Sequence, residues 1–329
     1  MKLMKFNGRG KLKNKSIFLS KRSPTLENLL NIVHQLDETF KIKNFGKDPA
    51  FSRYIPQVYE GKFDWRKKFE PEFNEFFNGL MIKGSPKVKN IFLAVFPTIH
   101  VLERFIEKGE SGDLLFMHHP LLMESGDPNG QWGRGFVPIE ESLLDQIISK
   151  GLSVYTCHIP MDYHGSLGTS HAIAEALNVD ITDRFIHDEK YGYIGIIGNV
   201  KPTKSEDLSD NLKRIFDVPY VDFEGRKKEI NKVAIVAGCG DKTQWMKLAE
   251  DKGADAYISG EIHCHIDNDY GRKRFEEVIK YASQTNMSLI GVSHAASEYL
   301  VKKTLIAPWF KENFDLETIN LIPQKDWWL

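Results

Sequence analysis

Short apolar runs alternate with longer amphipathic segments from about residue 88 to about residue 291. A run of this length is typical of a buried strand, and apolar side chains at i, i+3 and i+4 are typical of a helix. Strands separated by helices of 8 to 13 residues predict a layered α/β fold. Strands are expected at 91–95, 114–117, 153–156, 193–197, 233–236, 256–258 and 288–291. Helices are expected at 98–109, 140–150, 169–177, 205–216, 242–252 and 272–284.

The first 22 residues differ in composition from the rest of the chain. They contain eight basic residues and no acidic one, whereas the whole chain has 44 basic and 45 acidic residues and a net charge of -1. The remaining residues therefore have a net charge of -9. A short, basic, weakly periodic segment predicts a solvated tail at 1–22, with nucleic-acid or organelle targeting as the alternative. Folded structure is expected from residue 23, with Ser23 or Thr25 capping a first helix that runs through Leu36.

Composition excludes several classes of protein. The chain has 329 residues, of which 41% are hydrophobic, so it can bury a sizeable core and is not disordered over most of its length. No window approaches the about 18 uncharged apolar residues of a membrane span, and no apolar segment follows the basic start as in a secretory signal. Three cysteines without C-x-x-C spacing argue against a disulfide framework. We therefore expect a cytoplasmic protein, and the acidic body argues against nucleic-acid binding.

Histidines and carboxylates gather immediately after three of the predicted strands. The groups are His118 and His119 after 114–117, His158 and Asp162 after 153–156, and His294 and Glu298 after 288–291. Neighbouring side chains on a regular strand point to opposite faces, so His118 and His119 can share a pocket only where Pro120 ends the strand. A helix that begins near Ser293 places His294 and Glu298 on one face, because they are four residues apart. Since α/β sheets have their sites at the C-terminal ends of strands, the three groups are expected to meet.

These four histidines and two carboxylates form a ligand set for two metal ions. Nitrogen and oxygen donors without a thiolate suit zinc, iron, manganese or cobalt and do not select among them. Asp162 and Glu298 supply two negative charges, and a bridging hydroxide would reduce the remaining positive charge. Six protein ligands shared by two divalent ions leave open positions, as in a catalytic rather than a closed structural site. Each histidine alone is more often an ordinary polar residue, but its placement at a strand end recurs three times and favours the metal site.

Four segments in this order resemble the Nif-three-like dinuclear metal-centre family, often labelled GTP cyclohydrolase I type 2. They are 118–121, 155–162, 253–261 and 291–298, and the likeness covers roughly residues 80–300. The resemblance implies a two-lobed layered α/β fold within one unit at 23–329, with lobes of roughly 23–185 and 186–329 and the metal site between them. It also implies a ring-shaped homohexamer and a dinuclear site held by His118, His119, His158, Asp162, His294 and Glu298.

Three segments depart from the pattern of this family. The family often has an aspartate after the strand that here reads Ala94-Val95-Phe96-Pro97-Thr98. The aromatic segment at 45–80 and the Gly-rich loop at 126–135 have no counterpart in the pattern. The aromatic segment is expected to serve packing or a subunit interface. The loop is interpreted as a surface loop or, alternatively, as a lid in which Trp132 and Arg134 cover an anionic or heteroaromatic substrate.

The ligand set favours a metal-dependent hydrolase in which two metal ions lower the pKa of a bridging water and polarise a C–N or phosphate-type electrophile. The resemblance implies a cyclohydrolase-like reaction on a small-molecule substrate, either a nucleotide or related heterocycle or a phosphoester. Glu261 and His265 follow the strand at 256–258 and are candidates for proton transfer beside the metal-bound water, with Glu261 as the base; an orienting role is the alternative. The rival hypothesis is a non-catalytic metal-binding or metal-handling scaffold or regulatory protein.

Overall fold

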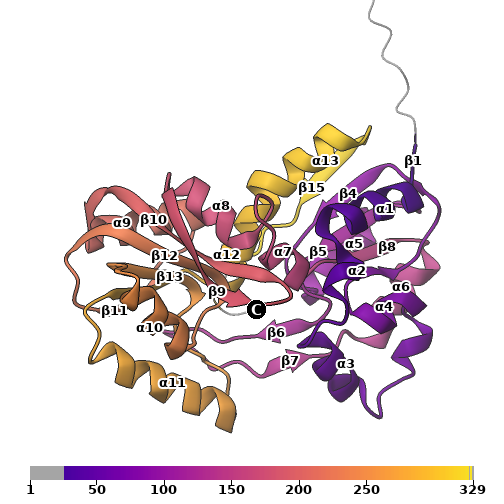
Figure 1. Cartoon of the computed structure of the whole chain (residues 1–329). Coiled ribbons are helices and arrows are strands. Elements are labelled where there is room, and N and C mark those ends of the chain that lie inside the picture. The colour runs from indigo at the N-terminus through magenta and orange to yellow at the C-terminus, as the bar shows by residue number, and fades with distance from the viewer. Residues whose placement is uncertain (1–25, 326, 328–329) are drawn as a thin grey trace, which may run out of the picture.

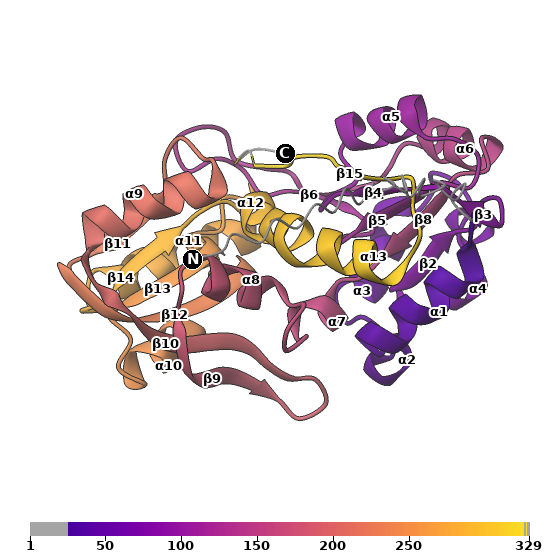
Figure 2. The same cartoon turned by 90° about the horizontal axis from the view of Figure 1, so that it is seen from above.

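The computed structural model describes residues 26–325 and 327, and it contains two larger β-sheets that lie side by side (Figures 1 and 2). The strands of the first sheet are β2 (Gly79–Ile82), β4 (Asn90–Leu93), β5 (Leu114–Met117), β8 (Ser153–Thr156) and β15 (Thr318–Leu321). They lie in the order β15-β4-β5-β8-β2. The first four of these are parallel, and β2 is antiparallel at the edge.

The second sheet has six strands. They are β9 (Asp180–Asp188), β10 (Gly192–Lys204), β11 (Asp222–Gly225), β12 (Glu229–Cys239), β13 (Ala256–Glu261) and β14 (Ser288–Gly291). They lie in the order β11-β14-β13-β12-β10-β9, with β12, β13 and β14 parallel to one another. Two small antiparallel ribbons pair β1 (Glu27–Asn28) with β3 (Lys87–Val88) and β6 (Leu122–Glu124) with β7 (Gly135–Val137).

Helices cover both sheets and fill the space between them. They are α1 (Leu29–Phe40), α2 (Ile42–Phe45), α3 (Phe51–Tyr59), η1 (Trp65–Lys67), α4 (Pro71–Phe76), α5 (Ile99–Lys108), α6 (Glu141–Ser149), α7 (Ile159–Asp162), α8 (Thr169–Ala176), α9 (Ser205–Phe216), α10 (Thr243–Asp251), α11 (Asp269–Ala282), α12 (His294–Val301), η2 (Lys302–Ile306) and α13 (Ala307–Asn313). Helices α5 and α6 pack on the outer face of the first sheet, and α10 and α11 pack on the outer face of the second. A single shared core, to which α1, α8, α9, α12 and α13 contribute, connects the inner faces of the two sheets.

Alternate residues of the central strands face different cores. In β5, Phe116 lies in the shared core and Leu115 in the outer core. In β13, Ile258 lies in the shared core and Tyr257 in the outer core. Because both faces are covered, the strands are buried along their length and appear in the sequence as continuous apolar runs. The predicted layered α/β fold is confirmed, whereas the division into lobes at 23–185 and 186–329 stays a prediction.

Several strand predictions were too short: the strands expected at 233–236 and 256–258 are β12 and β13, with 11 and 6 residues. The strand expected at 193–197 is β10, which has 13 residues and pairs with β9 in a long hairpin (Figure 2). Strand β9 was not predicted at all, because most of its residues are polar and exposed and it has no apolar run. Few side chains of this edge strand are buried, so its sequence lacks the apolar residues by which a strand is recognised.

The first helix begins later than expected. Asn28 caps α1, and its side-chain oxygen accepts a hydrogen bond from the Leu30 N–H at 2.9 Å. The predicted caps Ser23 and Thr25 and the basic tail at 1–22 lie outside the described residues. Asparagine caps a helix as well as serine or threonine does, so the sequence alone did not show which of these residues precedes the helix.

The aromatic segment at 45–80 forms an outer core beneath the first sheet. Six of its rings are buried, namely Phe51, Tyr59, Trp65, Phe69, Phe73 and Phe77. Five of them, all but Phe51, pack against one another in tilted and edge-on pairs, such as Phe69 and Phe73, whose ring centroids are 5.5 Å apart. The segment therefore serves packing within the chain, which is one of its two predicted roles.

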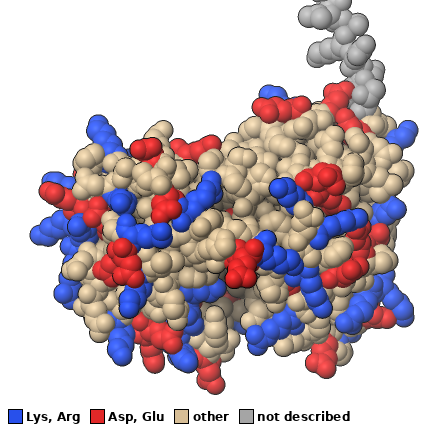
Figure 3. All heavy atoms as spheres, in the orientation of Figure 1, with Lys and Arg blue, Asp and Glu red and all other residues tan. Residues whose placement is uncertain are grey.

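Helix length and surface charge concern the expectations that the chain does not span a membrane and does not bind nucleic acid. Among the described residues, none of the helices is both long enough and apolar enough to cross a membrane. On the face of the molecule in Figure 3, basic and acidic side chains are interspersed. This face therefore offers no continuous basic surface of the kind that tracks a nucleic-acid backbone.

Candidate metal centre

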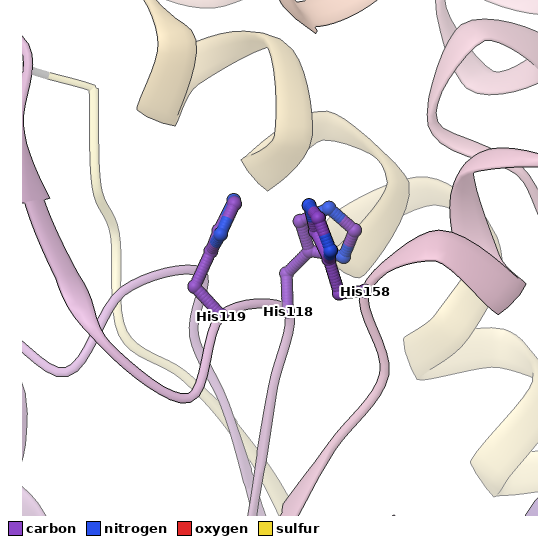
Figure 4. A group of neighbouring side chains, drawn as sticks. All are labelled: His118, His119 and His158. Carbon is purple, nitrogen blue, oxygen red and sulfur yellow. The ribbon is translucent and has the colours of Figure 1, made fainter. Parts of the chain in front are cut away.

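His118 and His119 lie in the loop that follows β5, at the C-terminal end of the first sheet (Figure 4). Their backbone N–H groups both donate to the Val95 carbonyl, at 3.1 and 2.9 Å. The strand has ended before this point, so the two neighbouring imidazoles enter the same space, with ring centroids 4.5 Å apart and ring planes at 87°. The prediction that the strand ends before Pro120 and lets both rings share a pocket is confirmed.

His158 enters this space from the loop after β8, and its ring centroid lies 5.2 Å from that of His118 and 4.9 Å from that of His119. Its backbone N–H donates to Asn78 Oδ1 at 2.7 Å. Its Nδ1 lies 2.8 Å from Asp48 Oδ2, and this carboxylate accepts the Nδ1 proton. The hydrogen bond leaves Nε2 of His158 with a free lone pair for a cation.

Asp162 is the last residue of α7, four residues beyond His158. Its Oδ1 accepts a hydrogen bond from the Thr169 hydroxyl at 2.9 Å. The same oxygen lies 3.3 Å from Nε2 of His118, and Oδ2 lies 3.8 Å from Nε2 of His158. The short helix therefore brings a carboxylate to the imidazoles of two different loops.

Helix α12 supplies the third pair of side chains. Ser293 caps it, accepting a hydrogen bond from the Ala296 N–H, and the helix begins at His294 as predicted. Glu298 lies one turn later, with Oε1 3.1 Å from Nε2 of His294. The last residues of β12 pass close to this pair: Gly238 has φ +67°, and a Cβ there would lie 2.3 Å from Glu298 Oε1. A glycine is required at this position because any side chain would occupy the space of the carboxylate.

The six predicted ligands form three overlapping groups. In each group, one potential ligand atom from every residue lies within 4.8 Å of the others. The groups are His118 with His119 and His158, His119 with His294 and Glu298, and His118 with Asp162 and Glu298. Two groups share Glu298, whose Oε2 lies 2.7 Å from Nε2 of His119 and whose Oε1 lies 3.5 Å from Nε2 of His118. A carboxylate whose two oxygens face different imidazoles has the lone pairs to bridge two cations.

An unpaired atom of the cluster fits a bound metal ion. Nε2 of His118, which faces Asp162 and Glu298, is buried and makes no hydrogen bond. A buried polar atom without a partner costs about 1–3 kcal/mol, which coordination to a cation would recover. Nδ1 of His118 donates to the Cys157 carbonyl at 2.7 Å and so presents Nε2 to the cluster with a free lone pair. The buried His/Glu/Asp cluster is therefore consistent with a metal site.

Burial disfavours a charge on every side chain of the cluster, and only mutual attraction offsets it. Burial would raise the pKa of Glu298, but His294, His118 and His119 outweigh it and hold that pKa well below its usual value. Burial would lower the pKa of His118, but Glu298 and Asp162 outweigh it and raise that pKa to about 9. For His119, burial prevails and lowers the pKa well below 6.5. Without metal the cluster thus balances its carboxylates with protons, which bound cations would replace.

The structure separates the two candidate proton-transfer residues. Glu261 ends β13, and its Oε1 lies 3.4 Å from Nδ1 of His294, so it approaches the cluster as expected. This placement suits an orienting role, and its role as a base stays a prediction. His265 lies in a different group, with Asp222 and His263, and none of the three groups of predicted ligands includes it. Its place in the sequence, four residues beyond the end of β13, lets the chain turn toward β11 instead.

Three residues of the site were not predicted from the sequence. Asp48 and Asn78 hold His158, and Phe96 stacks on His119 with ring centroids 4.1 Å apart and planes at 6°. Phe96 lies in the segment where the resembling family often has an aspartate, so a ring supports His119 from this loop. Asp48 and Asn78 precede His158 by 110 and 80 residues, and no local pattern connects either of them to it.

Asp48→Asn is expected to weaken metal binding by about 10- to 100-fold, because the amide NH2 turned toward His158 cannot accept its Nδ1 proton. The asparagine oxygen can still accept the Ala50 and Phe51 N–H groups that Asp48 caps, so the fold should be retained. Zn²⁺ titration against a competing chelator measures the change. Asp113→Asn is the matched control, since Asp113 is equally buried but lies before β5, at the opposite end of the sheet, and should bind metal as the unchanged chain does.

Comparison with known proteins agrees with this geometry. A family model described as Duf34/NIF3 (NGG1p interacting factor 3) matches residues 74–325. The chain belongs to the NIF3 family. A relative from Buchnera aphidicola subsp. Baizongia pistaciae, named GTP cyclohydrolase 1 type 2 homolog, is 26% identical over 246 residues, which are 74% of this chain and 88% of the relative.

Solved structures support the NIF3 fold. The structure titled protein ybgI, of unknown function, has a TM-score of 0.65 and 18% identity and covers 91% of this chain and 100% of its own. A Bacillus cereus protein related to NIF3 has a TM-score of 0.58 and 13% identity, with 92% of this chain and 99% of its own covered. At these identities the likeness concerns the fold alone, and it extends beyond the matched segment to most of the chain.

Proposed function

We propose that this NIF3-family chain is a hydrolase that depends on two divalent metal ions, held by His118, His119, His158, Asp162, His294 and Glu298. The observation that carries the proposal is that Glu298 belongs to two ligand groups at once, one with His118 and one with His119. Two ions bridged by one carboxylate are an arrangement used to activate water and to polarise an electrophile. The donor set suits zinc, iron, manganese or cobalt.

The protein side chains would position the ions and leave one side of them accessible. When bound, the cations supply Lewis acidity and a water of lowered pKa. The side chains of His158 and Asp162 are 16% and 10% exposed, whereas those of His118 and Glu298 are buried. A substrate would therefore approach from the side of α7. Phe96 and Phe51 pack on His119 and His158 and hold their rings away from bulk water.

The substrate class is inferred from a relative, whereas the metal ions are inferred from the cluster itself. The Buchnera relative is named a GTP cyclohydrolase 1 type 2 homolog, which favours a nucleotide or related heterocycle, with a phosphoester as the second choice. Bound divalent cations attract phosphate oxygens, so both classes suit the site. The homohexamer and the cytoplasmic location stay predictions, and light scattering of the purified chain tests the first.

The test is turnover of a panel of nucleotides and phosphoesters by protein reconstituted with each of the four metals. We expect metal-dependent hydrolysis that His119→Ala reduces by at least about 100-fold, since a ligand of the reacting centre is lost. The exposed His187→Ala is the control and should retain full turnover. Tight binding of two ions without hydrolysis of any compound would contradict the proposal and favour a metal-handling protein. Circular dichroism of each variant establishes that it is folded.

A further inference from the structure

A second cluster of potential metal ligands lies where the start of β11 and the loop after β13 come together. Asp222 is the first residue of β11, and His263 and His265 lie in the loop that follows β13. One potential ligand atom from each of the three lies within 4.8 Å of the others. The cluster shares no residue with the three groups of the candidate metal centre. Its ligands therefore belong to a different site.

His263 is buried in this cluster, whereas Asp222 is partly accessible. The His263 side chain is 3% exposed. Its Nδ1 faces Asp222, so Nδ1 and not the opposite ring nitrogen is the atom that can share an ion with this carboxylate. The Asp222 side chain is 13% exposed and marks the side from which an ion can enter.

The hydrogen bond within the cluster orients His263 for binding. Its Nδ1 lies 2.7 Å from Asp222 Oδ2, and the carboxylate accepts the Nδ1 proton. A cation could take the place of this proton, with Nδ1 of His263 and a carboxylate oxygen of Asp222 as two of its ligands.

Aromatic rings and a backbone pairing hold the two histidines in place. Phe275 on α11 packs against both, with ring centroids 5.0 Å from His263 and 5.3 Å from His265. Trp132 packs on His265 at 5.6 Å, and the Gly133 N–H donates to the His265 carbonyl at 2.7 Å. The loop at 126–135 is thereby joined to the second sheet beside Asp222. Ligands fixed in this way lose little entropy when they bind an ion.

We propose that Asp222, His263 and His265 form a separate mononuclear site for a divalent transition metal such as Zn²⁺ or Co²⁺. Two nitrogens and one oxygen are a donor set that such ions accept, and three protein ligands leave a fourth position open. A bound ion would connect β11, the loop after β13 and, through His265, the loop at 126–135. The site is independent of the proposed hydrolase centre, because it needs none of its ligands.

The experiment counts and characterises bound Co²⁺ in the full chain after removal of metal with a chelator. We expect His263→Gln to lower the Co²⁺ content by about one ion per chain and to remove one component of the visible absorption spectrum. Asp222→Asn should weaken the binding of the same ion, and it replaces His263→Gln in the experiment if that variant does not fold. The exposed His100→Gln is the control and should bind as the unchanged chain does.

The same titration in a Glu298→Gln background separates the two sites. There we expect an ion that remains bound and is lost only when His263→Gln is added. Equal Co²⁺ content and equal spectra with and without His263→Gln would overturn the proposal. The contact of Asp222 with His263 would then be a buried hydrogen bond and no part of a metal site. Absence of hydrolase activity in the unchanged chain, with the His263-dependent ion retained, would leave this site standing and contradict only the function proposed for the other.

Discussion

Replacing Glu298 by glutamine is expected to lower the metal content of the six-residue cluster from about two ions per chain to about one or fewer. Glu298 Oε1 lies 3.1 Å from Nε2 of His294, and Oε2 lies 2.7 Å from Nε2 of His119. Glutamine has the same shape, but its amide nitrogen cannot bind a cation and its negative charge is gone. Loss of an outer residue already costs about 10- to 100-fold in metal affinity, so loss of a shared ligand should cost more.

The measurement is metal analysis and chelator competition in a His263→Gln background, so that only ions of the six-residue cluster are counted. Glu175→Gln on α8 is the matched control, because Glu175 is an exposed glutamate that pairs with a histidine four residues before it, His171. It should leave metal content unchanged. Two tightly held ions in the Glu298→Gln variant would show that this carboxylate bridges nothing.

The parts of the site that follow directly from the chain order could be predicted from the sequence. A histidine that follows a buried strand of a parallel sheet lies at the C-terminal edge of that sheet, and this argument places His118 and His158 near each other. His294 follows β14 of the second sheet, so its approach to them also depends on how the two sheets pack. The i, i+4 spacing of His294 and Glu298 determines their common face once the helix starts at Ser293. These inferences need only local geometry and the sheet topology.

The supporting residues could not be predicted, since they reach the site through tertiary packing alone. Asp48 precedes α3 and contacts His158 because the aromatic segment folds beneath the first sheet. His265 lies close to Glu261 in sequence, yet the loop after β13 directs it toward Asp222 rather than toward the six ligands. Loop direction depends on contacts such as that of Gly133 with His265, which no periodicity reveals.

Lys302 is a buried lysine with weak partners, at the start of the π-helical segment η2. Its Nζ lies 3.4 Å from the Met161 sulfur and 4.3 Å from the centroid of the Phe116 ring. Burial lowers the pKa of this ammonium from 10.5 to about 7, and the negative charges of Glu298 and Asp162 only partly oppose it. Bound cations at the nearby cluster would repel the ammonium and lower the pKa further.

Lys302→Met is therefore expected to stabilise the chain by about 2–5 kcal/mol at pH 7, because an apolar side chain of similar length removes the cost of burying an amine. The folded-state pKa lies below the unfolded one, so between about pH 7 and pH 10.5 the unfolded chain holds a proton that the folded chain has lost. Stability of the unchanged chain should thus rise with pH across this window, and the advantage of the methionine variant should shrink.

Urea unfolding of the metal-free proteins at pH 7 and pH 9.5 measures both effects, since bound metal would add its own pH dependence. Lys252→Met is the control: Lys252 forms a surface ion pair with Asp183, and its loss should change the free energy of unfolding by about 1 kcal/mol or less. An advantage of Lys302→Met that stays constant with pH would mean that Lys302 remains protonated in its core. A destabilised variant would mean that the ammonium contributes more through Phe116 and the nearby carboxylates than its burial costs.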